Sequence, residues 1–387
     1  MNKSVLQNGV GVLLQQPDKF LQQRMALVTN NAATTISGEI TRVAFLKHKL
    51  HLVKLFSPEH GITVTGADGA AQQNIKDVIT GLPVISLYGN KLAPAEEDLL
   101  DIDVVLFDIP DVGCRFYTYL WTMTYVMEAC AQFNKPFVVL DRPNPIGALI
   151  EKAEGPFLDE ANCSSFIGRW NIPLKHSCTL GELALYFAAT RLPQLNIEII
   201  KVKNYQRHQT AFNDFAFTPT SPAIQTIHAA MLYPGTCLLE GVNINEARGT
   251  MHPFTMFGAP WMDIQKLMKA LNQLQLQGIT FTSVSYKAMA PPYTNETCNG
   301  IQLSITDVHN ISAVHTGICI LQTIAALHQE QLQERLYKTH ANPAGNNHLE
   351  KLLGIKNTWQ LLIHQQHFHI NCAGEWWQTI HPFLLYQ

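Results

Sequence analysis

The chain has 387 residues, a formal net charge of −3 and only 15% charged residues, below the roughly 25% of an average soluble domain. It has no block of lysine and arginine, and no apolar run reaches the roughly 18 residues that span a bilayer, so we expect no nucleic-acid partner and no membrane. The length predicts about two domains, and the composition, 47% hydrophobic, favours a globular enzyme over a disordered or scaffold protein.

The N-terminal stretch MNKSVLQNGVGVLLQQ is apolar only in part, because Gln7, Asn8 and Gln15 interrupt it. It also lacks the small-residue cleavage site of a signal peptide. As written, the chain is expected to be cytoplasmic, whereas a mature form that has lost its signal would be periplasmic or secreted. The eight cysteines are scattered with no C-x-x-C pair, which fits a reduced compartment and argues against zinc ribbons and disulfide frameworks.

From residue 25 onward, short apolar runs alternate with helical patterns. Strands are expected in MALVTN (25–30), LHLVKLF (50–56), LPVISLYG (82–89), DVVLFDIP (103–110), PFVVLDRP (136–143) and NIEIIKVKNY (196–205). Helices are expected at 37–49 and 117–133, and another begins at Thr179, because Thr179-Leu180-Gly181-Glu182 fits a capping box. Strands alternating with helices predict an α/β fold with a doubly wound parallel sheet in a first domain, residues 1–205.

The remaining residues, 206–387, are expected to form a second, smaller α/β domain. Its first part, up to about residue 222, is polar and poor in strand signals, and we interpret it as a crossover. Helical patterns follow at 262–274 and 312–327, and strand patterns at 279–288 and 300–307. A histidine group near the C-terminus has no acidic neighbour and is interpreted as surface rather than as a metal site: His364, His367 and His369.

The carboxyl ends of five predicted strands carry polar residues. The ligand crevice of an open parallel sheet lies beyond those ends, so we expect a site along this rim. Turn residues are polar in any case, so it is the occurrence of such residues at the ends of all five strands that points to a site. The residues in question are Asn30, Glu59, His60, Tyr88, Asp108, Asp111, Arg115, Tyr117, Tyr119, Asp141, Arg142 and Asn144.

The stretch LFSPEHG has the strongest functional signal. Pro58 stiffens the turn, and Glu59 and His60 together have no turn-forming role. Desolvation beside Phe56 would raise the pKa of Glu59, which suits a general acid. Either Asp108 or Asp111 could be a second carboxylate, and either could instead cap the helix that follows.

Other chemistries lack their motifs. Gly9-Val10-Gly11 precedes the first strand and is not a dinucleotide fingerprint, and there is no G-x-S-x-G elbow. The rim therefore favours acid/base or glycosidic chemistry, and no cofactor is expected.

Several long motifs resemble the NamZ-type exo-β-N-acetylmuramidases, a family long catalogued as a domain of unknown function. They include LFSPEHG, LFDIPDVGCRFYTYLWTM, FVVLDRPNPIGA and YPGTCLLEGVNINEARGTMHPF, and the resemblance covers nearly the whole chain. It implies a Rossmann-like N-terminal domain, a smaller C-terminal α/β domain and a cleft between them. It also implies release of N-acetylmuramic acid from the non-reducing end of peptidoglycan fragments, with Glu59 as the catalytic acid. We expect this reaction to be independent of a metal.

The sequence departs from the family pattern in two loops. Pro110 and Cys114 stand where the family usually has glutamine and alanine, and the loop ARGTMHPF carries Ala247, Met251 and His252. We expect these changes to affect which substrate is bound more than which reaction is catalysed.

N-acetylmuramic acid carries a lactyl carboxylate, which a planar arginine can bind with two hydrogen bonds. Arg115, Arg142 and Arg248 are the candidates. Tyr117 and Tyr119 are spaced two apart near a helix start, so we expect them to face different ways, with one in the core. The catalytic candidates are Glu59, His60, Asp108 and Asp111. The substrate-binding candidates are Asn30, Arg115, Tyr117, Tyr119, Asp141, Arg142, Asn144, His176, Glu240, Asn243, Arg248 and Thr250.

Two other hypotheses stay open. The first is a metal-dependent hydrolase that uses Glu59, His60, Asp108 and Asp111 as ligands. Activity that survives a chelator would argue against it. The second is a non-catalytic protein that binds muropeptides, for which tight binding without turnover would be the evidence.

Overall fold

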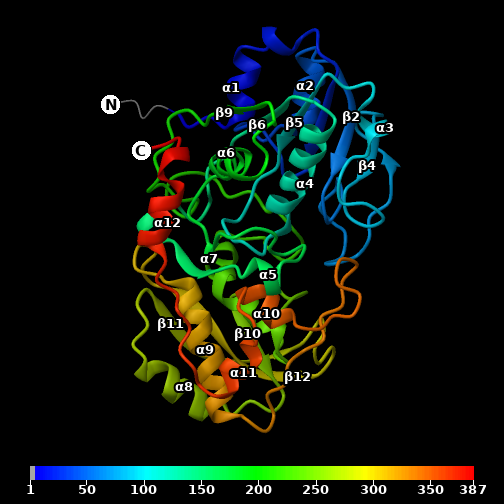
Figure 1. The fold of residues 1–387 in the computed structure, drawn as a ribbon. Helices are drawn as coiled ribbons and strands as arrows, with labels where there is room; N and C mark the ends of the chain where they lie inside the picture. The colour runs from blue at the N-terminus through cyan, green and yellow to red at the C-terminus, as the bar shows by residue number, and fades with distance from the viewer. Residues whose placement is uncertain (1–4) are drawn as a thin grey trace.

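The computed structural model describes residues 5–387 and shows an N-terminal and a C-terminal domain stacked end to end (Figure 1). The N-terminal domain has a seven-stranded sheet in the order β3-β4-β2-β1-β5-β6-β9. All neighbours pair in parallel except β3 at one edge. The strands are β1 (Met25–Thr29), β2 (Leu52–Ser57), β3 (Ile75–Lys76), β4 (Pro83–Ser86), β5 (Val104–Asp108), β6 (Phe137–Leu140) and β9 (Ile197–Ile200).

This strand order is that of a Rossmann-like doubly wound sheet, whose switch point lies between β1 and β5. The predicted fold class is therefore confirmed. Every residue of β1, β5 and β6 is buried, as expected for strands covered on both faces. The helices of this domain are α1 (Gly9–Gln15), α2 (Thr41–Lys47), α3 (Glu96–Leu99), α4 (Thr118–Gln132), α5 (Glu160–Cys163) and α6 (Leu180–Arg191).

One local feature of this domain was predicted from the sequence and another was not. The predicted capping box forms at the start of α6, where the backbone N–H of Thr179 donates to Glu182 Oε2 at 3.0 Å and that of Glu182 donates to the Thr179 hydroxyl. Helix α1 was not predicted. Its first residue, Gly9, lies so close to the sheet that a Cβ there would be 2.5 Å from the backbone nitrogen of Asp141. The glycine is required for packing, not for binding a phosphate.

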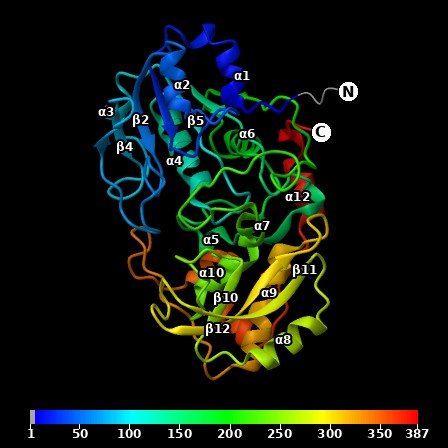
Figure 2. The ribbon, with the colours of Figure 1, turned by 180° about the vertical axis from the view of Figure 1, so that it is seen from behind.

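The C-terminal domain has a three-stranded sheet in the order β10-β12-β11, and all its pairs are antiparallel. Helix α9 lies in front of this sheet in Figure 1, and the sheet faces the viewer in Figure 2. The elements are α7 (Ile227–Thr236), β10 (Met256–Ala259), α8 (Ile264–Gln273), β11 (Ile279–Lys287), β12 (Thr297–Ile305), α9 (Ala313–Leu327), α10 (His348–Leu353) and α11 (Thr358–Ile363).

The end of the chain returns to the N-terminal domain (Figure 1). In helix α12 (Ala373–Ile380), the indole N–H of Trp376 donates a hydrogen bond to the carbonyl oxygen of His176 at 2.8 Å. The Tyr386 hydroxyl donates to Asp141 at 2.6 Å. A short hairpin of β7 (Glu154–Phe157) and β8 (Pro173–Lys175) completes the strands. The short 3₁₀ helices are Asp18–Phe20, Ile150–Lys152, Cys237–Gly241 and His381–Phe383.

Two buried charges join the domains. The guanidinium of Arg115, 0% exposed, donates to the carbonyl oxygens of Pro156 and Ile172 in the N-terminal domain and to those of Leu352 and Leu353 at the end of α10, all within 3.1 Å. Burial lowers the pKa of Arg115 to about 10, so it stays charged at neutral pH.

Glu154 makes the corresponding contact with the N-terminus of a different helix, α9. Its carboxylate accepts hydrogen bonds from the backbone N–H groups of Ala313, Val314 and His315 in the first turn of α9, at 3.0–3.1 Å. A cation at a helix C-terminus and an anion at a helix N-terminus both complement the helix dipole. The two contacts therefore fix the C-terminal domain on the N-terminal one.

Within the described residues, no helix is both long enough and apolar enough to cross a bilayer. All eight cysteines are free, seven of them buried and Cys319 partly exposed. The three histidines near the C-terminus are exposed, as expected.

We expect Arg115→Met to lower the free energy of unfolding by at least about 3 kcal/mol, because four buried carbonyls lose their donor and each unsatisfied group costs roughly 1–3 kcal/mol. Urea denaturation followed by circular dichroism measures this. Arg24→Met is the control, because Arg24 forms an exposed ion pair with Asp103, and it should leave the midpoint nearly unchanged. Equal midpoints for the two variants would contradict the role given to Arg115.

Candidate active site

A pocket of about 60 Å³ lies where the two domains meet, and Glu59 and His60 line it. Both domains contribute side chains to its wall. The polar and aromatic ones from the N-terminal domain include Glu59, His60, Asp68, Tyr88, Phe116, Tyr117, Thr118 and Phe166, and Ser221 lines the pocket from the connection between the domains. Those from the C-terminal domain are Tyr233, Glu240, Arg248, Phe254, Tyr337, Thr339 and His348.

Glu59 lies in the turn that follows β2. The turn is tight, with His60 at φ 66° and Gly61 at φ 70°, and a non-glycine residue rarely adopts such a positive φ. The Glu59 side chain is 5% exposed. Its Oε1 accepts the backbone N–H of Gly69 at 2.8 Å, and its Oε2 accepts the hydroxyl of Thr118 at 2.7 Å. Burial raises the pKa of Glu59, and the nearby charge of Asp68 raises it further, so this carboxyl group tends to keep its proton.

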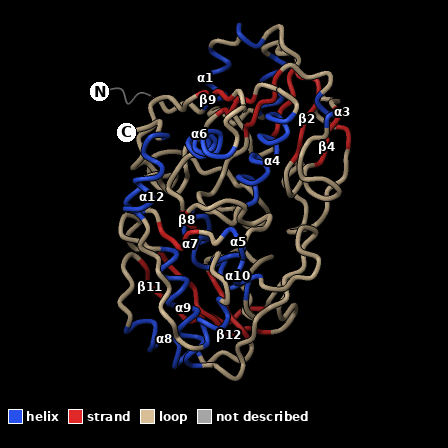
Figure 3. Tube along the Cα trace, viewed as in Figure 1, coloured by secondary structure: helices blue, strands red, loops and turns tan. Residues whose placement is uncertain are grey.

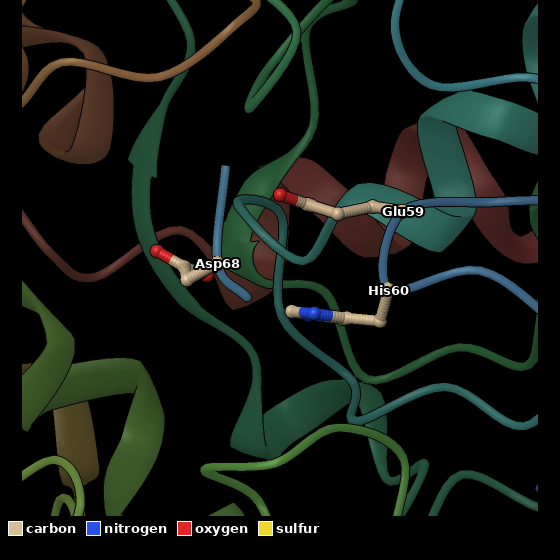
Figure 4. A group of neighbouring side chains, drawn as sticks. All are labelled: Glu59, His60 and Asp68. Carbon is tan, nitrogen blue, oxygen red and sulfur yellow. The ribbon is translucent and has the colours of Figure 1, made fainter. Parts of the chain in front are cut away.

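Asp68 joins Glu59 and His60 from the loop after the turn. Each residue has one atom that could bind a metal ion, a carboxylate oxygen or a ring nitrogen, and these three atoms lie within 4.8 Å of one another. Figure 4 shows Glu59 and His60 extending side by side toward the loop that carries Asp68. The Nδ1 of His60 lies 2.8 Å from the carbonyl oxygen of Gly66, which orients the ring. The three residues are a group able to hold a cation, but both Glu59 oxygens already accept hydrogen bonds.

The four ligands of the alternative metal-dependent hydrolase do not come together. Asp108 is 0% exposed and is bound by Arg142 at 2.5 Å and by the hydroxyl of Thr41. Asp111 accepts the N–H of Gly113 and lies 3.6 Å from His176. Both aspartates lie near the end of β5 at the switch point, outside the wall of the Glu59 pocket. Neither can therefore bind the same metal ion as Glu59.

Arg248 is the cation of the pocket. It is ion-paired with Glu240, with Glu246 at 3.1 Å and with Asp68 at 3.7 Å. Although burial alone raises the pKa of Glu240, Arg248 and His348 lower it to about 2. Burial and the charge of Glu240 raise the pKa of Glu246 to about 7. Among the described residues, the Nη1 of Arg248 has no hydrogen-bond partner, and the side chain is 16% exposed.

The other two arginines do not line this pocket. Arg115 is enclosed at the domain junction, and its Nη atoms bind only carbonyl oxygens. Arg142 pairs with Asp108 and lines a separate cavity of about 190 Å³ beside the switch point. That cavity is larger than the Glu59 pocket, but its wall includes neither Glu59 nor His60.

The prediction that one of Tyr117 and Tyr119 lies in the core is confirmed, but the two rings do not point apart. Their rings meet edge to face at 4.9 Å, and both hydroxyls donate to Thr220. The helical spacing argument does not apply, because Tyr117 precedes the first residue of α4 and has an extended backbone. Tyr117 lines the pocket, whereas Tyr119 is 0% exposed and belongs to the core.

The remaining predicted binding residues lie outside the pocket wall and bind nearby chain segments. Four of them are buried and tie the strand-end loops together: Asn30, Asp141, Asn144 and His176. Asn243 and Thr250 lie in the C-terminal domain and donate to the carbonyl oxygens of Gln331 and Ala247. The predicted catalytic and binding residues that do come together in the pocket are Glu59, His60, Tyr117, Glu240 and Arg248, and the rim residue Tyr88 joins them.

Sequence reasoning missed Asp68, Thr118, Tyr337 and His348, which all line the pocket. Asp68 stands in a short Gly-Ala-Asp-Gly turn with no motif of its own. Tyr337 and His348 lie near the other end of the chain from Glu59, so only the packing of the two domains could reveal them.

Comparisons with known proteins match nearly the whole chain. The family model described as exo-beta-N-acetylmuramidase NamZ, N-terminal, matches residues 25–228, and its C-terminal counterpart matches residues 231–386. The chain belongs to the NamZ family. The peptidoglycan beta-N-acetylmuramidase NamZ of Bacillus subtilis strain 168 is 38% identical to it over 336 residues, which cover 86% of this chain and 80% of the relative.

Two solved structures share the NamZ fold seen here. They are DUF1343 family proteins from Bacteroides fragilis NCTC 9343, with TM-scores of 0.86 and 0.75 at 30% and 27% identity. Each match covers 99% of both chains. The resemblance inferred from the motifs is thereby confirmed, and the fold is shared along the full length of these chains.

Gly69 is a backbone position that shapes this NamZ pocket, because its N–H binds Glu59. It has φ 67°, and a Cβ there would be 2.7 Å from the Cγ2 of Thr339. We expect Gly69→Ala to displace the N–H that binds Glu59 and to lower kcat/KM about 10- to 100-fold, the scale of a 1 Å misplacement. Gly38→Ala is the matched control, because Gly38 also has a positive φ of 83° but has no atom within 4 Å of its would-be Cβ. Steady-state rates equal to those of the control would contradict this expectation.

Proposed function

We propose that the protein is an exo-β-N-acetylmuramidase that releases N-acetylmuramic acid from the non-reducing end of small peptidoglycan fragments. The observation that carries the proposal is Glu59, a buried carboxyl that favours its protonated form in a pocket between the domains of a NamZ-family chain. Such a group can protonate the glycosidic oxygen as the bond to the sugar breaks. The Bacillus subtilis relative is named for this activity on peptidoglycan.

A bridge between the domains supports the choice of exo-acting cleavage. The Tyr337 hydroxyl donates to Asp68, and the backbone N–H of His340 donates to the carbonyl oxygen of Gly69 at 2.8 Å. In Figure 1 the C-terminal segment of this bridge, in orange, rises toward the blue and cyan part of the sheet domain, and Figure 3 shows that both segments are loops.

The bridge closes one side of the site, so the substrate meets a pocket and not an open groove. We therefore expect one sugar to be removed from a chain end at each turnover. Size-exclusion chromatography of long glycan strands during digestion measures this, because an exo-acting enzyme releases single sugars with little early loss of polymer length. Rapid shortening of the strands would contradict exo-acting cleavage.

We propose that Arg248 binds the lactyl carboxylate of the substrate. Of the three candidates it alone lines the pocket, and its Nη1 has no hydrogen-bond partner among the described residues. N-acetylmuramic acid differs from N-acetylglucosamine by this ether-linked acid. A site that distinguishes the two sugars must therefore engage the carboxylate, and a guanidinium edge matches its shape.

The direct test is turnover of an aryl β-N-acetylmuraminide beside the matching N-acetylglucosaminide, with and without a chelator. Hydrolysis of the muraminide that a chelator does not affect supports the proposal. Tight binding without turnover would favour a binding protein, and loss of activity with the chelator would favour a metal-dependent hydrolase.

We expect Glu59→Gln to abolish turnover of substrates with poor leaving groups, because an amide keeps the shape but has no acidic proton. Loss of general acid catalysis corresponds to roughly 10²–10⁴-fold in rate. In the wild type, kcat/KM should fall as the pH rises through the raised pKa of Glu59, since only the protonated form donates. Glu97→Gln, at an exposed position, is the control. A near-normal kcat in Glu59→Gln would refute the assignment.

We expect Arg248→Lys to reduce the preference for the muramic sugar about 10- to 150-fold, the equivalent of roughly 1.5–3 kcal/mol for a hydrogen bond to a charged group. The measurement is the ratio of kcat/KM for the two aryl glycosides. Arg335→Lys is the matched control, because Arg335 also pairs with Glu246, at 3.5 Å, but does not line the pocket. If both variants keep the wild-type ratio, another group reads the carboxylate.

A further inference from the structure

We propose that Asp68 is the second catalytic carboxylate, that it attacks the anomeric carbon, and that the hydrolysis therefore retains the configuration of the sugar. This inference rests on the proposed glycosidase function and assigns the partner of Glu59. Sequence patterns placed that role on Asp108 or Asp111, and neither residue reaches the pocket.

The spacing of the two carboxyl groups supports retention. An oxygen of Asp68 and an oxygen of Glu59 lie within 4.8 Å of each other. Retaining glycosidases hold their two carboxyl groups about 5–5.5 Å apart, whereas inverting ones leave roughly 6.5–9.5 Å for a water molecule. The oxygen pair of Glu59 and Asp68 is therefore closer to the retaining spacing than to the inverting one.

The surroundings of the two residues suit different tasks. Glu59 is 5% exposed and accepts hydrogen bonds from an amide and a hydroxyl. The Asp68 side chain is 35% exposed, lies 3.7 Å from Arg248 and accepts a hydrogen bond from the Tyr337 hydroxyl. Asp68 thus combines an accessible carboxylate with a neighbouring cation and a hydrogen-bond donor that hold it in place, which is the setting of a carboxylate nucleophile.

The other carboxylates near the pocket are committed elsewhere. Glu240 is 4% exposed and is held by Arg248 and His348. Glu246 is 0% exposed, pairs with Arg248 and Arg335 and does not line the pocket. Asp68 is the lining carboxylate with a substantial part of its side chain open.

The chemistry balances as two displacements. Glu59 gives its proton to the glycosidic oxygen, and the bond from the anomeric carbon to that oxygen breaks with its electron pair on the leaving alcohol. A lone pair of Asp68 forms the new bond to the anomeric carbon, which yields a glycosyl ester. Water then attacks the same carbon, its proton passes to the ionised Glu59, and the ester electron pair returns to Asp68. Two inversions at one carbon leave the configuration unchanged.

The first measurement is the proton NMR spectrum of the sugar released by the wild type, recorded before mutarotation. We expect the β-anomer to appear first. An α-anomer as the first product would overturn the proposal while leaving the exo-muramidase function intact. A wild type that releases no sugar at all would instead refute the proposed function, so the two failures are distinguishable.

The second measurement is chemical rescue of Asp68→Ala with azide on an activated aryl muraminide. We expect the variant to lose at least about 100-fold in kcat and azide to restore turnover with formation of the α-glycosyl azide. The control is Asp18→Asn, at an exposed position far from the pocket in sequence, and it should keep wild-type rates.

Three results would contradict the role of Asp68. The first is near-normal kcat in Asp68→Ala, and the second is loss of wild-type activity with a chelator. The third is a retaining wild type whose Asp68→Ala variant folds, as shown by an unchanged melting curve, but gives no azide adduct. That third result would assign the attack to the acetamido group of the substrate.

Discussion

The structure depends first on the contact of two buried charges with two helix ends. Arg115 binds the last carbonyls of α10, and Glu154 binds the first N–H groups of α9. The pocket exists only because residues of both domains face each other across it, with Glu59 on one side and Arg248 on the other. Charges that are desolvated in this way stabilise the structure only in one geometry, because any displacement leaves them unpaired. The junction thus specifies how the domains are oriented, beyond holding them together.

Environment gives similar side chains different roles in this molecule. Glu59, Glu240 and Glu246 are all buried, yet burial sets the direction of the pKa shift at Glu59 and Glu246, whereas the charges of Arg248 and His348 outweigh it at Glu240. The three candidate arginines divide in the same way. One is enclosed at the domain junction, one is paired at the switch point, and one has an open edge in the pocket. Residue type and position at a strand end did not distinguish these cases.

The sequence predicted the sheet well and placed Glu59 in a turn after a buried strand, because both features depend on local signals. Buried strands read as apolar runs, the capping box at Thr179 is a four-residue pattern, and the SPEHG turn follows its strand directly. Rim residues such as Asp141 and Asn144 lie at strand ends as expected, but they bind neighbouring loops. The second half of the pocket could not be predicted, because Tyr337 and His348 reach Glu59 only through the docking of a distant domain. The short helix α1 was missed because its apolar residues are too few to show a period.

The bridge across the pocket places its cover and its chemistry on the same segment. The pocket volume of about 60 Å³ is below the roughly 300–1,000 Å³ of typical ligand sites, and the segment that carries the bridge lies against it. The same loop carries Asp68 and the Gly69 N–H that binds Glu59. Any displacement of this loop would therefore move the proposed nucleophile and the donor to the proposed acid together, so the cover of the pocket and the proposed reaction centre belong to one segment of the chain.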